Sequence, residues 1–164
     1  MRTADDPVIR KLTAALRSET AQRAKIGIRT HVLTVDAALE RSGTDTGPNP
    51  PETLLAALAG CLNIQINRLA GERGIRFERM ALSIDAHFDR RGVIWNEDVA
   101  VPFPLISSAV EAKSDASASR IAKIRRDAFR CCPVSRVLIE GGTRFRQTTW
   151  PVDRLQPVGG RGEA

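Results

Sequence analysis

Residues 51–70, PETLLAALAGCLNIQINRLA, decide the fold of this chain, because they predict one long helix. Asn49 and Glu52 stand at the spacing of a capping box, and prolines fill the two positions between them, where a first helical turn tolerates proline. Residues 54–62 are all apolar or small, so this part of the helix has no polar side to turn to water. We therefore expect a helix buried on every side, by its own chain or by a second subunit.

The segments around this helix alternate between strand and helix patterns. Every second residue of 80–88 is apolar or small, which is the period of a half-buried strand. Residues 116–132 predict an amphipathic helix that ends at Cys132, since Pro133 disfavours helical geometry in the residue before it. Weaker patterns predict a short helix within 5–20, a strand at 27–35, a loop at 42–50, strands near 99–103 and 106–113, and a final strand or hairpin at 137–139 and 145–150. This order has no regular βαβ alternation and indicates an α+β fold with a largely antiparallel sheet.

Length and composition fit a single domain over residues 1–164, with an N-terminal helical extension at 1–24 and a loose tail at 156–164. The first residues lack the apolar core of a signal peptide, and no apolar run reaches about 18 residues, so we expect a cytoplasmic protein without a membrane partner. The net charge of +6 raises the possibility of nucleic-acid binding. The arginines are spread along the chain and aromatic residues make up only 4%, so a solvated basic surface without a nucleic-acid partner is the better interpretation.

Three cysteines, Cys61, Cys131 and Cys132, are the residues best suited to chemistry. Free cysteines are among the most buried residue types, so core packing is one interpretation. The Cys-Pro step at 132 places one sulfur at an irregular backbone position, where another group can approach it, which favours thiol chemistry. The only histidines, His31 and His87, lie in predicted strands, and zinc spacing, a serine-hydrolase elbow and a phosphate-binding glycine loop are all missing from the sequence. We expect no metal and no cofactor.

Two stretches carry a resemblance to a known family. GTDTGPNPPETLLAALAGCL at 43–62 and SDASASRIAKIRRDAFRCCPVSRVL at 114–138 resemble the two signature segments of the OsmC/Ohr family, which comprises osmotically inducible protein C, organic hydroperoxide resistance proteins and their relatives. The resemblance extends over residues 25–150. It implies an α+β fold in which antiparallel sheets wrap around a long buried central helix, in an intertwined homodimer with active sites at the subunit interface.

The resemblance also implies a peroxidase mechanism. Cys61 takes the position of the family's peroxidatic residue and Cys132 that of its resolving residue. The Cys61 thiolate would attack an organic hydroperoxide and become a sulfenic acid, and Cys132 would condense with it to a disulfide. An external dithiol or lipoyl-type reductant would then reopen this disulfide, in a role in oxidative stress defence.

A reactive thiolate needs a lowered pKa, and the interior of a helix gives no benefit from the helix dipole, so a cation near Cys61 is required. The resemblance assigns this role to an arginine of the N-terminal strands, for which Arg29 is the first candidate and Arg23 and Arg41 are competitors. It assigns to Glu52 the acid that holds the arginine. Glu52 lies nine residues before Cys61, as in a less characterised OsmC-like branch, and a purely capping role for it is an equal alternative.

The remaining expectations concern the substrate and the rival functions. Cys131 is interpreted as packing or incidental. A ligand-binding OsmC-like protein without peroxidase turnover is the first alternative function, and a basic nucleic-acid module is the second. The walls for an alkyl tail of the substrate are assigned to four leucines of the long helix, Leu54, Leu55, Leu58 and Leu62.

Overall fold

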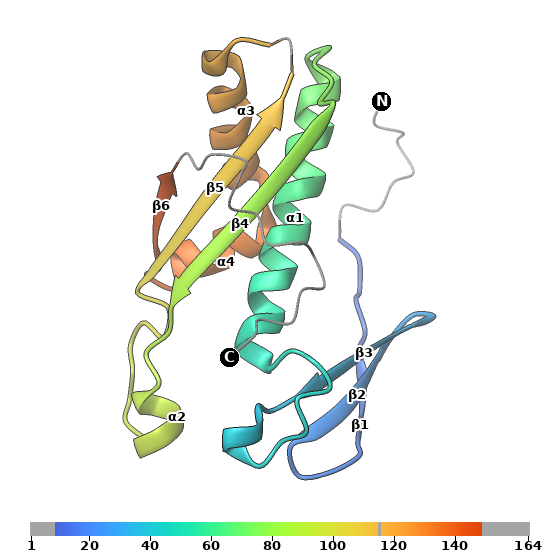
Figure 1. Ribbon diagram of the computed structural model, residues 1–164, viewed down its shortest axis with the longest axis vertical. Coiled ribbons are helices and arrows are strands. Elements are labelled where there is room, and N and C mark those ends of the chain that lie inside the picture. The colour runs from blue at the N-terminus through green and yellow to red at the C-terminus, as the bar shows by residue number, and fades with distance from the viewer. Residues whose placement is uncertain (1–8, 115, 149–164) are drawn as a thin grey trace. The chain divides into compact units, whose positions relative to one another are not determined.

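The computed structural model describes residues 9–114 and 116–148 (Figure 1). The chain divides into two compact units, Met1–Leu54 and Leu55–Ala164. The predicted tail at 156–164 and the first eight residues of the predicted N-terminal extension lie outside the described residues. The expectation of a single domain stays a prediction.

The first unit contains a three-stranded antiparallel sheet of β1 (Ala15–Ser18), β2 (Arg23–Ile28) and β3 (His31–Asp36), in that order. The prediction of a helix within residues 5–20, and of a helical extension to residue 24, is wrong over residues 9–24. All four side chains of β1 are exposed, so no apolar stripe is buried there as a helix would require. Pairing with β2 satisfies the backbone of β1, and this tertiary contact overrides a weak local preference for helix.

The predicted single strand at 27–35 is in fact the end of β2, a tight turn and most of β3. Ile28 pairs with His31, which leaves Arg29 and Thr30 as the two turn residues. Arg29 adopts a left-handed conformation with φ of 54°, a geometry for which glycine or asparagine is the usual signal. Because neither residue stands here, the strand formers on both sides concealed the turn. The predicted loop that follows is present, after a short 3-10 helix at Leu39–Arg41.

The second unit contains a sheet in the order β4-β5-β6. β4 and β5 are antiparallel, as predicted, while β6 runs parallel to β5. A parallel pair needs a crossover connection, and the two helices between β5 and β6 provide it. The weak strand predicted near 99–103 is not formed. The elements are β4 (Arg79–His87), α2 (Arg91–Trp95), β5 (Leu105–Lys113), α3 (Ala118–Cys131), α4 (Pro133–Glu140) and β6 (Arg144–Thr148).

Helix α4 corrects the prediction of a strand at 137–139. The run of Val, Leu and Ile at these positions is too short to distinguish strand from helix by its pattern. Pro133 occupies the first turn of α4, where its missing N–H costs nothing, and Leu138 is buried on the inner side of the helix. Gly142, with φ of 89°, then turns the chain into β6.

The long helix α1 (Pro50–Glu72) is confirmed and extends one residue before and two residues beyond the predicted 51–70. In the second unit Arg73, the residue directly after α1, forms an ion pair with Asp127 of α3. Figure 1 shows both helices alongside the β4–β5 pair. The core of the unit combines one stripe of α1, one stripe of α3 and the inner face of β5. Its most deeply buried apolar residues are Leu58, Leu62, Ile66, Ala70, Ile106, Ile124 and Ala128.

Among the described residues only one side of α1 is buried, so burial on every side requires a second subunit and stays a prediction. Ala56, Ala57 and Gly60 are exposed, and Ile64 is 63% exposed. Among the described residues, α1 is the one helix whose length and mean hydropathy would suffice to cross a membrane. The buried stripe of α1 is what a core helix of a folded domain shows, and the exposed small residues leave room for a second helix beside it.

Candidate active site

Cys61 and Cys132 come together in the second unit, although 71 positions separate them in the sequence. Their Sγ atoms are 2.7 Å apart and both thiols are free. Cys61 is half-buried in the middle of α1, whereas Cys132 is fully buried between α3 and α4. A disulfide bond closes at about 2.05 Å, so this pair is within reach of a bond with little movement.

Cys132 occupies a junction that two helices share. Its N–H donates to the carbonyl of Ala128 at 2.9 Å and closes α3, as the Cys-Pro step predicted. Its backbone then becomes extended, with φ of −75° and ψ of 116°, and the residue becomes the N-cap of α4. In this second role the Sγ of Cys132 accepts a hydrogen bond from the N–H of Ser135 at 3.4 Å. The sulfur thus lies at the positive end of α4.

Ser135 is a buried residue of this site that sequence reasoning missed. Its Oγ lies 2.5 Å from the carbonyl oxygen of Phe129 and 2.9 Å from that of Cys132, and its single O–H is shared between these two acceptors. These two contacts hold the last turn of α3 against the first turn of α4 and fix the junction around Cys132. The sequence feature that could have predicted this junction is Pro133, because a proline that ends one helix can also stand in the first turn of the next.

Burial, and after it the hydrogen bond with Cys132 and the repulsion between two negative sulfurs, raise the pKa of the Cys61 thiol to about 11. The backbone N–H of Val134, in the first turn of α4, acts in the opposite direction. As expected, the interior of α1 does not lower the pKa of Cys61. The N-terminus of α4 does lower it, through the N–H of Val134, and the sequence analysis did not predict this contact. Without a further cation, Cys61 is a thiol at neutral pH.

The predicted activating residues Arg29 and Glu52 both lie in the first unit. Arg29 is exposed at the turn between β2 and β3, and its Nη2 lies 3.0 Å from Nε2 of His31. Glu52 and Asn49 form a reciprocal capping box: the Asn49 N–H donates to Oε2 of Glu52 at 2.8 Å, and the Glu52 N–H donates to Oδ1 of Asn49 at 3.0 Å. The capping role of Glu52 is therefore confirmed, and a role of either residue at Cys61 stays a prediction.

The competing arginines differ in their surroundings. The half-buried Arg23 donates from Nε to Oε2 of Glu19 at 3.1 Å and from Nη1 to Oγ1 of Thr44 at 2.9 Å. An acid thus already holds Arg23 in the first unit. Arg41 is exposed in the short 3-10 helix.

The four leucines assigned to the substrate walls have two different environments. Leu58 and Leu62 are fully buried and belong to the core of the second unit, while Leu54 and Leu55 are half-buried. Contact of any of them with a substrate stays a prediction. Cys131 was expected to be packing or incidental; it is exposed, which excludes packing in the core and agrees with an incidental position. In residues 9–114 and 116–148, no three His, Cys, Asp or Glu side chains gather as metal ligands would.

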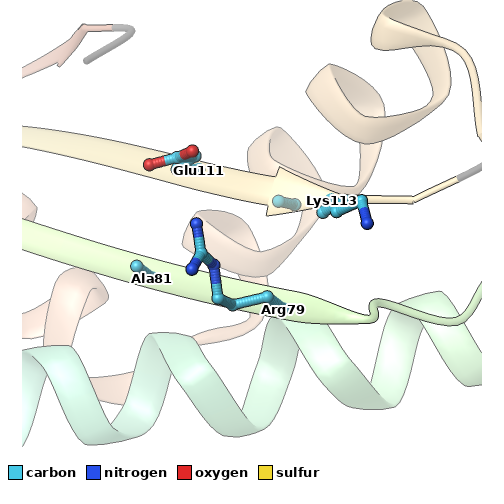
Figure 2. Close-up of a pocket in the computed structure, with 5 residues that line it drawn as sticks. Arg79, Ala81, Glu111 and Lys113 are labelled. Atoms are coloured by element: carbon cyan, nitrogen blue, oxygen red, sulfur yellow. The ribbon is translucent and has the colours of Figure 1, made fainter. Parts of the chain in front are cut away.

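An open pocket of about 230 Å³ lies on the β4–β5 pair, away from the cysteines (Figure 2). The strand register puts Arg79 opposite Lys113 and Ala81 opposite Glu111, so these four side chains share one face of the sheet. The core residue Ile106 belongs to the other face. The pocket contains none of the predicted site residues, and its exposed charged lining does not bear on the thiol pair.

This chain has an α+β fold with a dithiol site. Cys61 of the long helix α1 faces Cys132 at the junction of α3 and α4. The chain belongs to the OsmC-like protein family, whose model matches residues 43–147. This finding confirms the family that the two signature stretches resemble. No curated protein sequence matches the chain significantly.

Several solved structures have the same fold as this chain at low sequence identity. An OsmC-like protein from Mycoplasma pneumoniae has a TM-score of 0.69 at 17% identity, over 85% of this chain and 94% of that one. An OsmC-like protein of unknown function from Vibrio cholerae has a TM-score of 0.70 at 8% identity, over 87% and 100% of the two chains. An organic hydroperoxide resistance protein from Legionella pneumophila has a TM-score of 0.66 at 14% identity, over 87% and 98%. The α+β OsmC-like fold is therefore established for this chain.

Proposed function

We propose that this protein is a thiol-dependent peroxidase that reduces organic hydroperoxides in the cytoplasm. The observation that carries the proposal is the 2.7 Å separation of the Cys61 and Cys132 sulfurs. The Cys61 thiolate attacks the terminal peroxide oxygen, the O–O bond breaks, and the alkoxide leaves and takes up a proton to become an alcohol. The Cys132 thiolate then displaces hydroxide from the Cys61 sulfenic acid, which forms the disulfide and, after protonation, water. An external dithiol returns both cysteines to thiols.

Two further observations support the proposal. Several proteins of the same fold, including the one from Legionella pneumophila, are named as organic hydroperoxide resistance proteins. The half-buried position of Cys61 beside the fully buried Leu58 and Leu62 gives it apolar surroundings. The proposal requires a cation to counter the raised pKa of Cys61, and Arg29, oriented by Glu52, is the residue that we assign to this role.

Peptide mass spectrometry after one equivalent of cumene hydroperoxide tests the proposal directly. We expect a disulfide between the tryptic peptides 42–68 and 131–136, with one alcohol formed for each disulfide. In Cys132→Ser the same treatment is expected to leave Cys61 as a sulfenic acid, which excess peroxide converts to sulfinic acid. Cys131→Ser is the matched control and is expected to form the disulfide as the unchanged protein does. Unconsumed peroxide together with reduced Cys61 would contradict the proposal.

The second candidate function is binding of a small apolar or sulfur-containing ligand without turnover. The raised pKa of Cys61 favours it, because a protonated thiol is a poor nucleophile. Native mass spectrometry of the purified protein distinguishes the two functions. A bound ligand of constant mass, with no reaction toward peroxide, would support ligand binding.

The free side of α1 supports a homodimer. Ala56, Ala57 and Gly60 give this side a small and apolar surface, and among the described residues no atom beyond the neighbouring helix backbone lies within 4 Å of the position that a Cβ of Gly60 would take. Another helix can therefore approach closely, and a second copy of the chain supplies one. We expect sedimentation at micromolar concentration to show a dimer, and Ile64→Glu to shift it toward monomer, with the exposed Glu72→Ala as the control. A chain that sediments only as monomer would exclude this arrangement.

A further inference from the structure

We infer that the disulfide of this site is reduced from one side only: an external thiol attacks the sulfur of Cys61 and expels Cys132 as the leaving thiolate. The inference rests on the proposed function, since it concerns how the Cys61–Cys132 pair is regenerated. It assigns the two sulfurs different roles in reduction, and three features of the site support the assignment.

The first feature is access. Cys132 is 0% exposed, enclosed between the end of α3 and the start of α4, whereas Cys61 is half-buried. Closing the bond from a separation of 2.7 Å needs little movement, so the disulfide keeps this difference in exposure. Thiol–disulfide exchange needs the incoming sulfur to reach the sulfur that it attacks. Within one chain an external thiol can therefore reach Cys61 and not Cys132, and the proposed dimer has to leave this opening at Cys61 free.

The second feature is the place of the leaving group. When Cys132 is expelled, its sulfur becomes negative at the N-cap of α4, where the N–H of Ser135 already donates to it. The positive end of α4 favours this charge. The hydroxyl of Ser135, anchored on the carbonyls of Phe129 and Cys132, keeps the donor in position. Ser135 is thus a positioning residue for the leaving sulfur.

The third feature is the basicity of Cys61. Burial and the neighbouring Cys132 raise the pKa of its thiol to about 11, even with the opposing hydrogen bond from the N–H of Val134. A thiol of high pKa is the poorer leaving group, so an attack on Cys132 that expels Cys61 is disfavoured chemically as well as by access.

The reaction then has two balanced steps. One thiolate of an external dithiol forms a bond with Sγ of Cys61, the Cys61–Cys132 bond breaks, and Cys132 leaves as a thiolate that takes up a proton. The second thiolate of the dithiol then attacks the first sulfur of the same dithiol, which is bonded to Sγ of Cys61. This attack expels Cys61 as a thiolate, which takes up a proton. The protein gains two electrons and two protons, and the dithiol becomes a cyclic disulfide.

Trapping the mixed disulfide tests the inference. The disulfide is formed with diamide, which needs no peroxidase activity, so a failure of the proposed function leaves the test intact. The oxidised protein is mixed briefly with 2-mercaptoethanol, quenched with acid, blocked with N-ethylmaleimide and digested with trypsin. The Cys131→Ser background is used, because Cys131 and Cys132 share the tryptic peptide 131–136 and only this change makes the assignment unambiguous.

We expect the 2-mercaptoethanol adduct on the peptide 42–68 and the maleimide on 131–136, with at least about tenfold more adduct on Cys61 than on Cys132. An adduct mainly on Cys132, or shared equally, would overturn the inference. A disulfide that forms with diamide but yields no adduct would also overturn it, because Cys61 would then not be the accessible sulfur. Ser135→Ala, which keeps the N–H but removes the anchoring hydroxyl, is expected to slow the release of Cys132 while leaving the site of attack unchanged.

Discussion

Replacing Cys61 by serine is expected to lower the rate of organic hydroperoxide consumption by at least about three orders of magnitude, because a hydroxyl cannot replace the thiolate as nucleophile. The rate is measured as the loss of cumene hydroperoxide over time with dithiothreitol as reductant. Cys131→Ser is the matched control, since Cys131 is exposed and outside the pair, and it is expected to react at the rate of the unchanged protein. Equal rates for the Cys61→Ser variant and the unchanged protein would remove Cys61 from the mechanism.

Removing the proposed activating cation, Arg29, is expected to lower the rate by an amount that depends on pH. In Arg29→Ala the nucleophile is still present, but no cation opposes the burial and the Cys132 contact that raise the pKa of Cys61 to about 11. Because only the thiolate reacts, the rate of this variant should be low at neutral pH and should recover as the pH rises toward that pKa. Arg17→Ala, at an exposed position of β1 that is not a candidate for this role, serves as the control. A pH profile of Arg29→Ala that matches the control would assign the cation to another residue, for which Arg23 is the next candidate.

Replacing Asp36 by alanine is expected to destabilise the first unit strongly. Asp36 is 1% exposed, and its Oδ2 accepts hydrogen bonds from the backbone N–H and the Oγ1 of both Thr44 and Thr46, at 2.5 to 3.1 Å. These contacts hold the loop that leads into α1. Without the carboxylate the two N–H groups lose their acceptor, and we expect the melting temperature to fall by about 5–10 °C.

Glu40→Ala is the matched control, because it removes the same charge from an exposed position of the same unit. The hydrogen bonds from Thr44 and Thr46 outweigh the effect of burial and hold the pKa of Asp36 far below its usual range. The carboxylate therefore stabilises the folded chain above the unfolded pKa of about 3.9, and this stabilisation is lost as the pH falls toward the folded value. The difference in melting temperature between the unchanged protein and Asp36→Ala should shrink below about pH 4. A difference that stays constant with pH would contradict the role of the charge.

Local signals in the sequence located several elements well. Asn49 and Glu52 marked the start of α1, and the structure shows their reciprocal hydrogen bonds. The alternation at 80–88 located β4 to within one residue. Two short segments were predicted wrongly. Residues 9–20 have a weak local preference for helix, which pairing with β2 overrides. The apolar run at 137–139 is too short to distinguish strand from helix, and the helix start at Pro133 decided between them.

Caps, prolines and periodicity act over a few residues, and they were enough to place Cys61 within a long apolar helix and Cys132 at the end of another. The 2.7 Å separation of the two sulfurs has no such local signal, because it depends on how α1 packs against the junction of α3 and α4. The same packing buries Cys132 at the N-cap of α4 and leaves Cys61 partly open. No local pattern encodes this difference, because the enclosure of each sulfur depends on side chains contributed by distant parts of the chain.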